Sequence, residues 1–317
     1  VVILRSEQDI EAFLGMLRHG RKVADATISF HVVLDKPIMQ VATLRACLQR
    51  LRNLEDLQLS LRHLKHSGWR RLLRNICFTR LDLFYSNAPH DVISQFLWSH
   101  SRIAFLRIEE CVKAGRSCPL DGGQLPELCD VSAPVGCVLS LVKNNPVSRV
   151  TAQQGAPLII TALMSSLAST TTNLTVLELD VNPSDFDVLG RIVRAAPALT
   201  ALKLLETQTF KSRRSHQRRA WKDGKSWGKT LRGLTHLQHF ALRTSLYTPA
   251  IFCNIGSGAY LIEQWGGGKV RPHPALQRIL LWHSFGTIHS CISVWELLQS
   301  TWRRSNDFHD AVPSLFV

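Results

Sequence analysis

The 317-residue chain lacks the cysteine spacing of a zinc-binding or disulfide-rich domain. Its eight cysteines include no C-x-x-C pair, and the spacings from Cys111 to Cys118 and from Cys129 to Cys137 match no ordinary zinc framework. We therefore expect structural thiols, with no metal ion and no cofactor. Because free thiols persist in reducing compartments, the same pattern predicts a cytoplasmic or nuclear protein.

Long apolar runs are also missing. The longest, such as 157–160 and 162–164, are far shorter than the roughly 18 residues of a membrane helix. With 45% hydrophobic and 20% charged residues, the composition is that of a folded, soluble protein that does not span a membrane. Residues 1–5 contain no basic region, cleavage site or initiator methionine, which indicates a fragment without its true start.

Catalytic motifs are the third absence. The sequence has no G-x-S-x-G elbow, H-E-x-x-H pair, dinucleotide fingerprint or calcium loop. Residues 224–230 resemble a phosphate-binding loop, but the glycines are one position too close and no apolar strand precedes them. His63 and His66 have no nearby cysteine or carboxylate that would complete a metal site. We expect a protein that is not an enzyme.

What the chain does have is a repeated pattern, L-x-x-L-x-L, in which an apolar residue is followed three and five positions later by others. The nine repeats open at Val23, Leu54, Phe78, Ile103, Val147, Leu174, Leu199, Leu237 and Leu276. Four of the eight gaps fall within 24 to 27 residues, which is leucine-rich-repeat spacing. The pattern predicts an α/β fold: one domain over 1–317, an irregular leucine-rich-repeat solenoid with a curved parallel sheet and outer helices.

Longer gaps between repeats predict loop insertions near 113–125, 207–231 and 248–274. The first is rich in Gly, Pro, Ser and Asp, and the third is rich in Gly, so both should be exposed and the third mobile.

The second insertion is strongly basic. Residues 207–232 contain nine Lys or Arg against one Asp, a net charge of +8 out of +14 for the chain. The patch consists of Lys211, Arg213, Arg214, Arg218, Arg219 and Lys222. Three interpretations fit it: nucleic-acid binding with Trp221 and Trp227 stacked on bases, a nuclear-import signal, or a solvated loop that attracts acidic partners.

The concave face of the expected sheet is the other candidate surface. One expected row is Gln58, Asp82, Arg107, Thr151, Glu178, Lys203, Ala241 and Leu280, and its flank is Ser60, Phe84, Glu109, Gln153, Asp180, Leu205, Arg243 and Trp282. Opposite charges at Asp82/Arg107 and Glu178/Lys203 would then lie on neighbouring strands and only stabilise the sheet.

Alternatively, Phe84, Arg107, Arg243 and Trp282 on this face supply the aromatic and arginine anchors of a protein-binding surface. Changing Phe84 and Trp282 to Ala should then abolish binding and leave stability nearly unchanged. A large loss of stability would instead place both side chains in the core.

Three segments resemble a known family. Residues 125–128 (L-P-E-L), 145–150 (N-P-V-S-R-V) and 273–279 (H-P-A-L-Q-R-I) resemble stretches of fungal, mushroom-type F-box/leucine-rich-repeat proteins, although Asn145 stands where that family usually has Arg. The resemblance covers most of the chain at the level of repeat layout and carries no catalytic residues. It implies a ubiquitin-ligase adaptor, which would dock on a Skp/cullin scaffold only if an F-box lies upstream, because none is present in this chain.

Together these patterns predict a protein–protein interaction module, the substrate-recognition repeat region of such an adaptor, whose partner is another protein. The alternative is a basic repeat protein that binds RNA or DNA through the 211–229 loop. The two differ in salt dependence, since binding through several phosphate contacts weakens by orders of magnitude between about 50 and 200 mM salt.

Overall fold

The computed structural model describes residues 1–111, 118, 120, 125–153, 157–207, 219–244, 255–266, 272–285, 288–299 and 301–305. The chain divides into two compact units. Unit 1 comprises Val1–Val147 and Thr170–Thr172, and unit 2 comprises Ser148–Ser169 and Asn173–Val317. Across the described residues the fold is mixed α/β, with thirteen strands that are mostly parallel in an open arrangement. No helix within these ranges is long and apolar enough to cross a membrane.

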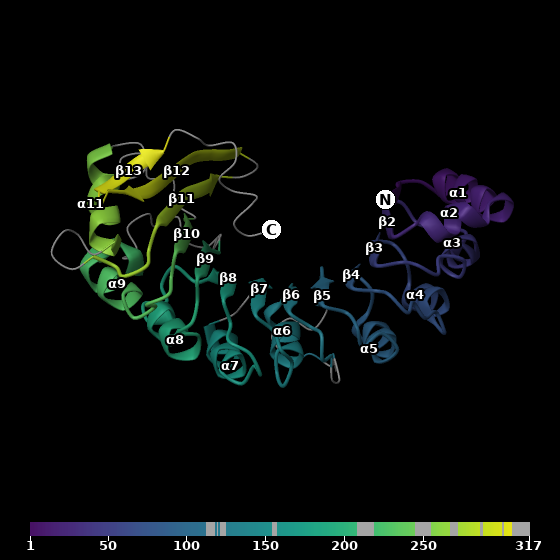
Figure 1. Cartoon of the computed structure of the whole chain (residues 1–317), viewed down its shortest axis with the longest axis horizontal. Helices are drawn as coiled ribbons and strands as arrows, with labels where there is room; N and C mark the ends of the chain where they lie inside the picture. Colours follow the sequence, from purple (N-terminus) through teal and green to yellow (C-terminus); the bar gives the residue numbers. More distant parts are fainter. Residues whose placement is uncertain are drawn as a thin grey trace. The chain divides into compact units, whose positions relative to one another are not determined.

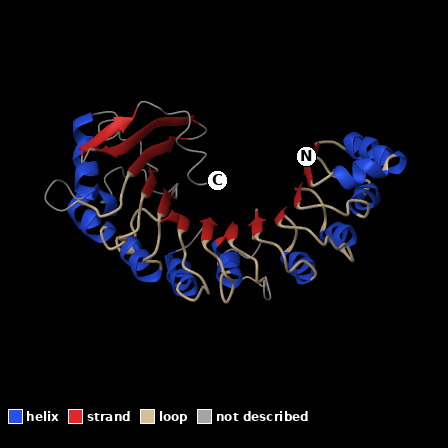
Figure 2. Cartoon of the chain, viewed as in Figure 1, coloured by secondary structure: helices blue, strands red, loops and turns tan. Residues whose placement is uncertain are grey.

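Unit 1 alternates short strands with helices (Figure 1). Its strands pair in parallel and in chain order: β1 (Val2–Leu4), β2 (Ser29–Leu34), β3 (Asp56–Leu61), β4 (Leu83–Ser86), β5 (Phe105–Ile108) and β6 (Asp130–Pro134). Its helices lie on one side of these strands (Figure 2): α1 (Glu7–His19), α2 (Arg21–Ala26), α3 (Val41–Leu48), α4 (His66–Leu73), α5 (His90–Trp98) and α6 (Val135–Leu141).

Helix α1 shows why these residues form helices. The Ser6 hydroxyl accepts a hydrogen bond from the Asp9 amide at 3.1 Å, and the Asp9 carboxylate accepts one from the Ser6 amide at 2.9 Å, which is a complete capping box. Ile10, Phe13, Leu14 and Leu17 then recur on one face and are buried. The Phe13 ring stacks on Phe30 of β2, so this face fixes the helix against the sheet.

Unit 2 continues the same alternation but ends differently. Its strands are β7 (Arg149–Gln153), β8 (Val176–Val181), β9 (Ala201–Glu206), β10 (His239–Thr244), β11 (Arg278–Phe285), β12 (Ile288–Leu298) and β13 (Thr301–Ser305). Its helices are α7 (Pro157–Leu167), α8 (Val188–Ala195), the 3-10 helix η1 (Ala220–Lys222), α9 (Gly224–Leu231) and α11 (Ile255–Gly266). Pairing is parallel from β7 to β11 and antiparallel from β11 to β13.

Each unit contains one continuous row of directly paired apolar residues that face the helices. The row is Phe30, Leu57, Phe84, Leu106 and Val131 in unit 1, and Val150, Leu177, Leu202, Phe240 and Ile279 in unit 2. All ten side chains have 0% exposure. Each repeat therefore buries the same position against its neighbours, as the L-x-x-L-x-L pattern predicts.

The repeat boundaries expected in unit 1 are wrong at three places. Phe30 pairs with Leu57, so the first repeat opens at Thr27 rather than Val23. Phe84 pairs with Leu57, so the third repeat opens at Leu81 rather than Phe78, and Asp82 precedes the strand instead of pairing with Gln58. In addition, β6 forms inside the 44-residue gap before Val147, where no strand was expected. Phe78, Leu81 and Phe84 are three residues apart, so the repeat pattern can start at Phe78 or at Leu81. The repeat that starts at Leu81 ends in the polar Ser86, and for this reason the pattern favoured the wrong start.

The expected insertions are partly described. Most of 113–125 and residues 208–218 lie outside the described residues. The rest of the second insertion forms η1 and α9, and the Gly-rich third insertion contains helix α11 where a mobile loop was expected.

Candidate functional site

The side of the unit 1 sheet that faces away from the helices presents a second row of side chains. We call this the open face, and it comprises Ile3, His31, Val33, Gln58, Tyr85, Arg107 and Ser132. Neighbouring strands pair these positions directly, apart from Val33, which lies two residues beyond His31 on the same face. Ile3, Val33 and Arg107 are exposed, and the others are half-buried.

Part of the open face is occupied by hydrogen bonds to Asp56. The Oδ2 atom of Asp56 lies 2.7 Å from Nε2 of His31 and accepts a hydrogen bond from the Ser29 hydroxyl at 2.8 Å. The Gln58 amide donates to the other oxygen at 3.3 Å. This carboxylate has partners on β2 and on its own strand, β3, so it helps to hold these two strands together.

A second carboxylate, Glu109, is held in the same way beside β5. The Tyr85 hydroxyl donates to Oε2 of Glu109 at 2.9 Å, the Ser60 hydroxyl donates at 3.3 Å, and the Arg62 guanidinium lies 3.5 Å away. Burial, together with the adjacent Glu109 carboxylate, raises the pKa of Tyr85 to about 12, so the hydroxyl remains a donor at neutral pH. Arg107 has no hydrogen-bond or ion-pair partner among the described residues, and it is the cation of the open face that remains available.

The four expected protein-binding anchors are divided between the two units, and one of them is not at the surface. Phe84 is a core residue, because it has 0% exposure and its ring lies 4.5 Å from the Phe96 ring of α5, so the expectation that it anchors a partner is wrong. Arg107 lies on the open face of unit 1, whereas Arg243 and Trp282 belong to unit 2.

Within unit 2, Arg243 is half-buried on β10, and Trp282 is only 8% exposed. Trp282 packs in a cluster with Leu205, Ala241, Leu280 and Val294. Nζ of Lys203 lies 5.7 Å from the centre of the Trp282 ring, within the range of a cation–π contact. Trp282 therefore packs within its own unit and exposes little of its ring to a partner.

The two expected charge pairs have opposite outcomes. Glu178 and Lys203 pair directly between β8 and β9, and their charged atoms are 2.9 Å apart, which confirms that expectation. Asp82 and Arg107 do not pair, because the shifted start of β4 places Tyr85 beside Arg107.

The basic patch is described only in part. Lys211, Arg213, Arg214 and Arg218 lie outside the described residues. Arg219 is buried, and its guanidinium donates to Glu206 at 2.6 Å, so it does not belong to a solvated patch as expected. Lys222 is exposed beside the Trp221 ring, with 5.9 Å between Nζ and the ring centre.

The tryptophans of this region are core residues. Trp221 is 2% exposed, and its indole N–H donates to Glu206 at 2.7 Å. Trp227 is 5% exposed and lies against the rings of Phe240 and Trp265. Neither ring is available to stack on a nucleic-acid base, which removes the aromatic support for that interpretation.

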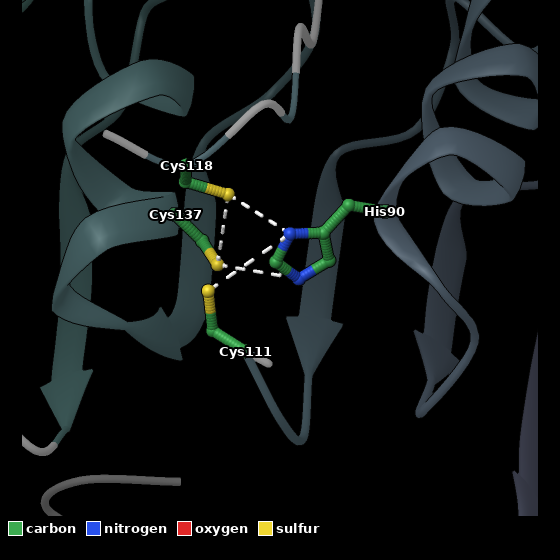
Figure 3. Close-up of side chains that lie close together, drawn as sticks. All are labelled: His90, Cys111, Cys118 and Cys137. Atoms are coloured by element: carbon green, nitrogen blue, oxygen red, sulfur yellow. Dashed lines mark hydrogen bonds between the residues drawn. The ribbon is translucent and has the colours of Figure 1, made fainter. Parts of the chain in front are cut away.

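The structure also brings together His90, Cys111, Cys118 and Cys137 in unit 1 (Figure 3). Nδ1 of His90 lies 3.0 Å from Sγ of Cys118 and 3.9 Å from Sγ of Cys111. The sulfurs of Cys118 and Cys137 are 3.5 Å apart, and Nε2 of His90 lies 3.6 Å from Sγ of Cys137. One donor atom from each residue lies within 4.8 Å of all the others.

These four side chains also perturb one another's protonation. The hydrogen bond with Cys118 is the main cause that raises the pKa of His90. The hydrogen bond between Cys118 and Cys137 is the main cause that lowers the pKa of Cys118, and His90 lowers it further. The same hydrogen bond, together with burial, raises the pKa of Cys137. The two shifts act in the same sense, because a lower pKa at Cys118 and a higher pKa at His90 both strengthen the contact between the sulfur and the imidazole.

Sequence reasoning missed this cluster, since it assigned the cysteines to structural roles and did not single out His90. A usable signal exists in the repeat layout: His90, Cys111 and Cys137 each follow the end of a strand by three or four residues. Because parallel strands end at the same edge of a sheet, residues at this offset in successive repeats come together.

No protein-family model matches the chain, and no curated protein matches it either.

Proposed function

We propose that the protein binds another protein through the open face of unit 1. The observation that carries this proposal is a row of paired positions that faces away from the helices and exposes Ile3, Val33 and Arg107 on rigid strands. Because the strands hold the row in place, little ordering entropy would be lost on binding.

The chemistry of the open face suits a protein partner. Arg and Tyr are enriched among residues that dominate protein interfaces, and Arg107 lies directly beside Tyr85 in the pairing of β4 with β5. The aliphatic side chains of Ile3 and Val33 add apolar area, and the carboxylates of Asp56 and Glu109 are already hydrogen-bonded within the protein. A mixed surface of this kind matches the composition of non-obligate interfaces.

We further propose that the chain is an irregular leucine-rich-repeat solenoid and the substrate-recognition region of a ubiquitin-ligase adaptor in the cytoplasm or nucleus. The directly paired, fully buried rows support the repeat architecture. The resemblance of residues 125–128, 145–150 and 273–279 to F-box/leucine-rich-repeat proteins supports the adaptor role. Docking on a Skp/cullin scaffold would require an F-box from outside these 317 residues.

The test is site-specific photo-crosslinking of the full chain in cells. A photoreactive amino acid replaces Arg107 on the open face or, in the matched control, Arg71, an exposed arginine of α4. Arg71 lines a groove on the helix side together with Arg45, Arg70 and Arg74, so it samples a competing cationic surface. We expect position 107, and not position 71, to crosslink to a discrete protein that mass spectrometry identifies.

Binding of the identified partner is then measured with purified Arg107→Glu and Arg71→Glu variants. The first should lower affinity at least about tenfold, since truncation or reversal of an interface arginine costs more than about 1.4 kcal/mol at a dominant position. The second should leave affinity unchanged. Crosslinks from position 71 alone, crosslinks to nucleic acid, or equal effects of both charge reversals would contradict the proposal.

A further inference from the structure

We propose that His90, Cys111, Cys118 and Cys137 bind one Zn²⁺ ion as a closed structural site in unit 1. The site does not depend on the proposed protein-binding function, because none of its four residues belongs to the open face.

The distances among the donor atoms match the edges of a zinc tetrahedron. With Zn–S bonds of about 2.3 Å and a Zn–N bond of about 2.0 Å, tetrahedral geometry requires about 3.8 Å between sulfurs and about 3.5 Å between sulfur and nitrogen. The Cys118 and Cys137 sulfurs are 3.5 Å apart, and Nδ1 of His90 is 3.0 and 3.9 Å from the sulfurs of Cys118 and Cys111. The remaining donor atoms lie within 4.8 Å of one another, so shifts of up to about 1 Å would complete the tetrahedron.

The kind of donor selects the metal. Three thiolates and one imidazole form a Cys₃His set, which is a standard structural zinc set, whereas calcium and magnesium prefer oxygen ligands. Four protein ligands fill the coordination shell and leave no position for water or substrate. The ion would therefore stabilise the fold and not act in catalysis.

Surrounding groups orient the ligands as metal sites require. The backbone carbonyl of Glu110 lies 3.2 Å from Nε2 of His90. A proton on Nε2 can be donated to this carbonyl, which leaves the lone pair of Nδ1 for the metal. The amide of Leu120 donates to Sγ of Cys118 at 3.4 Å, a contact that favours the thiolate.

A disulfide explains the cluster less well. A bond between Cys118 and Cys137 would need about 2.05 Å between sulfurs, and the observed 3.5 Å leaves both cysteines free. Such a bond would also give no role to Cys111 and His90, which contact the same two sulfurs. A catalytic thiol also explains the cluster less well than a zinc site. Cys118 and Cys137 are only 8% and 0% exposed, so a substrate would not reach their sulfurs.

The ligands come from three successive connections of unit 1. His90 begins α5 after β4, Cys111 and Cys118 follow β5, and Cys137 lies in α6 after β6. An ion at this position would tie together the chain at the carboxyl ends of three neighbouring strands. Because unfolding would release the ligands, the free energy of zinc binding would add to the stability of this part of unit 1.

The experiment starts with metal analysis of the full chain purified under reducing conditions without chelator. We expect about one zinc per chain by mass spectrometry of the elements, and a cobalt-substituted sample should show the visible absorption of tetrahedral cobalt with thiolate charge transfer. Removal of zinc should lower the thermal midpoint by about 5 °C or more and speed hydrogen exchange in peptides that cover α5 and α6, but not α8.

Variants separate the ligands from bystander cysteines. Cys111→Ser should weaken zinc binding by about a hundredfold or more, because loss of even an outer partner costs about 10- to 100-fold. The matched control, Cys77→Ser, changes an exposed thiol outside the cluster and should leave affinity unchanged. His90→Cys should retain zinc and shift the cobalt spectrum toward that of a four-thiolate site, which keeps the test informative if Cys111→Ser does not fold.

Four results would overturn the proposal: no zinc in the protein together with no cobalt binding, a different metal at the cluster, a Cys118–Cys137 disulfide in the purified chain, or equal zinc affinity in Cys111→Ser and Cys77→Ser.

Discussion

Unit 1 and unit 2 bury the same row of strand residues but use the opposite side of the sheet differently. In unit 1 the open face carries the half-buried His31, Gln58 and Tyr85 and the exposed Arg107. In unit 2 the corresponding row begins with the half-buried Thr151, Glu178 and Lys203 and ends in Ala241, Leu280 and Val294, none of which is more than 1% exposed. Strand pairing thus fixes which positions share a row, while the residue types in the row decide between surface and second core.

The same contrast holds for buried charge. Glu206 of unit 2 receives Arg219 and Trp221 in a site where both charged side chains are 5% exposed or less. Glu109 of unit 1 is 24% exposed, and its arginine partner Arg62 is 60% exposed. A buried ion pair tolerates no loss of one partner, whereas a pair near solvent contributes little, so the two units should respond differently to matched changes.

The largest expected effect tests what the units share. Phe84→Ala in unit 1 and Phe240→Ala in unit 2 each delete a ring with 0% exposure, so each should lower the free energy of unfolding by about 3–5 kcal/mol. Urea denaturation of the full chain measures the loss, and hydrogen exchange localises it to the altered unit. Phe84→Leu keeps most of the apolar volume and should cost less than Phe84→Ala, about 1–2 kcal/mol. Unchanged stability with lost partner binding in Phe84→Ala would restore Phe84 as a surface anchor.

Removal of a glutamate should cause a comparably large loss of stability in unit 2 and only a small loss in unit 1. Glu206→Ala removes the carboxylate that balances buried Arg219 and should cost about 3–5 kcal/mol. The matched Glu109→Ala should cost about 1 kcal/mol or less, because solvent screens and replaces its partners. Chemical denaturation gives both values, and equal losses would mean that the difference in burial does not govern these sites.

Alanine substitutions at two helix glycines should change stability by smaller amounts, one lowering it and the other raising it. A Cβ at Gly228 of α9 would overlap the Gln264 carbonyl of α11 and lie 2.9 Å from its carbon, so Gly228→Ala should destabilise unit 2 by about 1–3 kcal/mol. Gly15 of α1 has no neighbouring atom within 4 Å of the added Cβ, so Gly15→Ala should stabilise unit 1 by up to about 1 kcal/mol. Thermal melts of both variants check the signs, and a stable Gly228→Ala protein would show that α9 and α11 can separate.

The smallest effect concerns pH and His100 of unit 1. Burial lowers the pKa of His100, whose Nδ1 donates to the Phe96 carbonyl at 2.7 Å and whose Nε2 accepts from the Phe78 amide at 3.0 Å. Because the unfolded chain binds this proton more readily, the stabilising contribution is complete above about pH 6.5 and is lost as the pH falls.

His100→Gln should therefore show a shallower loss of unfolding free energy than the parent protein between about pH 7.5 and 5.5. Both proteins are measured with chelator present, so that release of metal by acid does not contribute. Parallel pH curves would show that His100 titrates alike in the folded and unfolded chains.

The sequence predicted the α/β class and the parallel pairing because apolar positions recur at the spacing of strand-and-helix repeats. In unit 2 the expected row Thr151, Glu178, Lys203, Ala241 and Leu280 is confirmed residue by residue. In unit 1 the row failed at Asp82, where Phe78, Leu81 and Phe84 allow two openings three residues apart. An odd shift exchanges the faces of a strand, and Phe84 therefore moved from the expected surface to the core.

The Cys and His cluster escaped prediction for a different reason. Metal motifs are recognised by short spacings within one loop or hairpin, whereas these donors span 48 residues from His90 to Cys137. Their proximity follows from the pairing of β4, β5 and β6, which no local pattern specifies. The expected availability of Trp221 and Trp227 failed similarly, since only packing with Glu206, Phe240 and Trp265 determines their burial.

One feature of unit 1 bears on how such a chain changes in length. Phe30 pairs with Leu57 and Leu57 pairs with Phe84, and each step covers 27 residues. Residues 55–81 therefore form one complete repeat, whose two ends occupy equivalent positions next to successive strands. Recombination that duplicates or removes this segment would join equivalent backbone positions, so the ladder can lengthen or shorten in whole steps without disturbing its neighbours. Evolution could adjust the extent of the open face by this route while each retained step keeps its own packing.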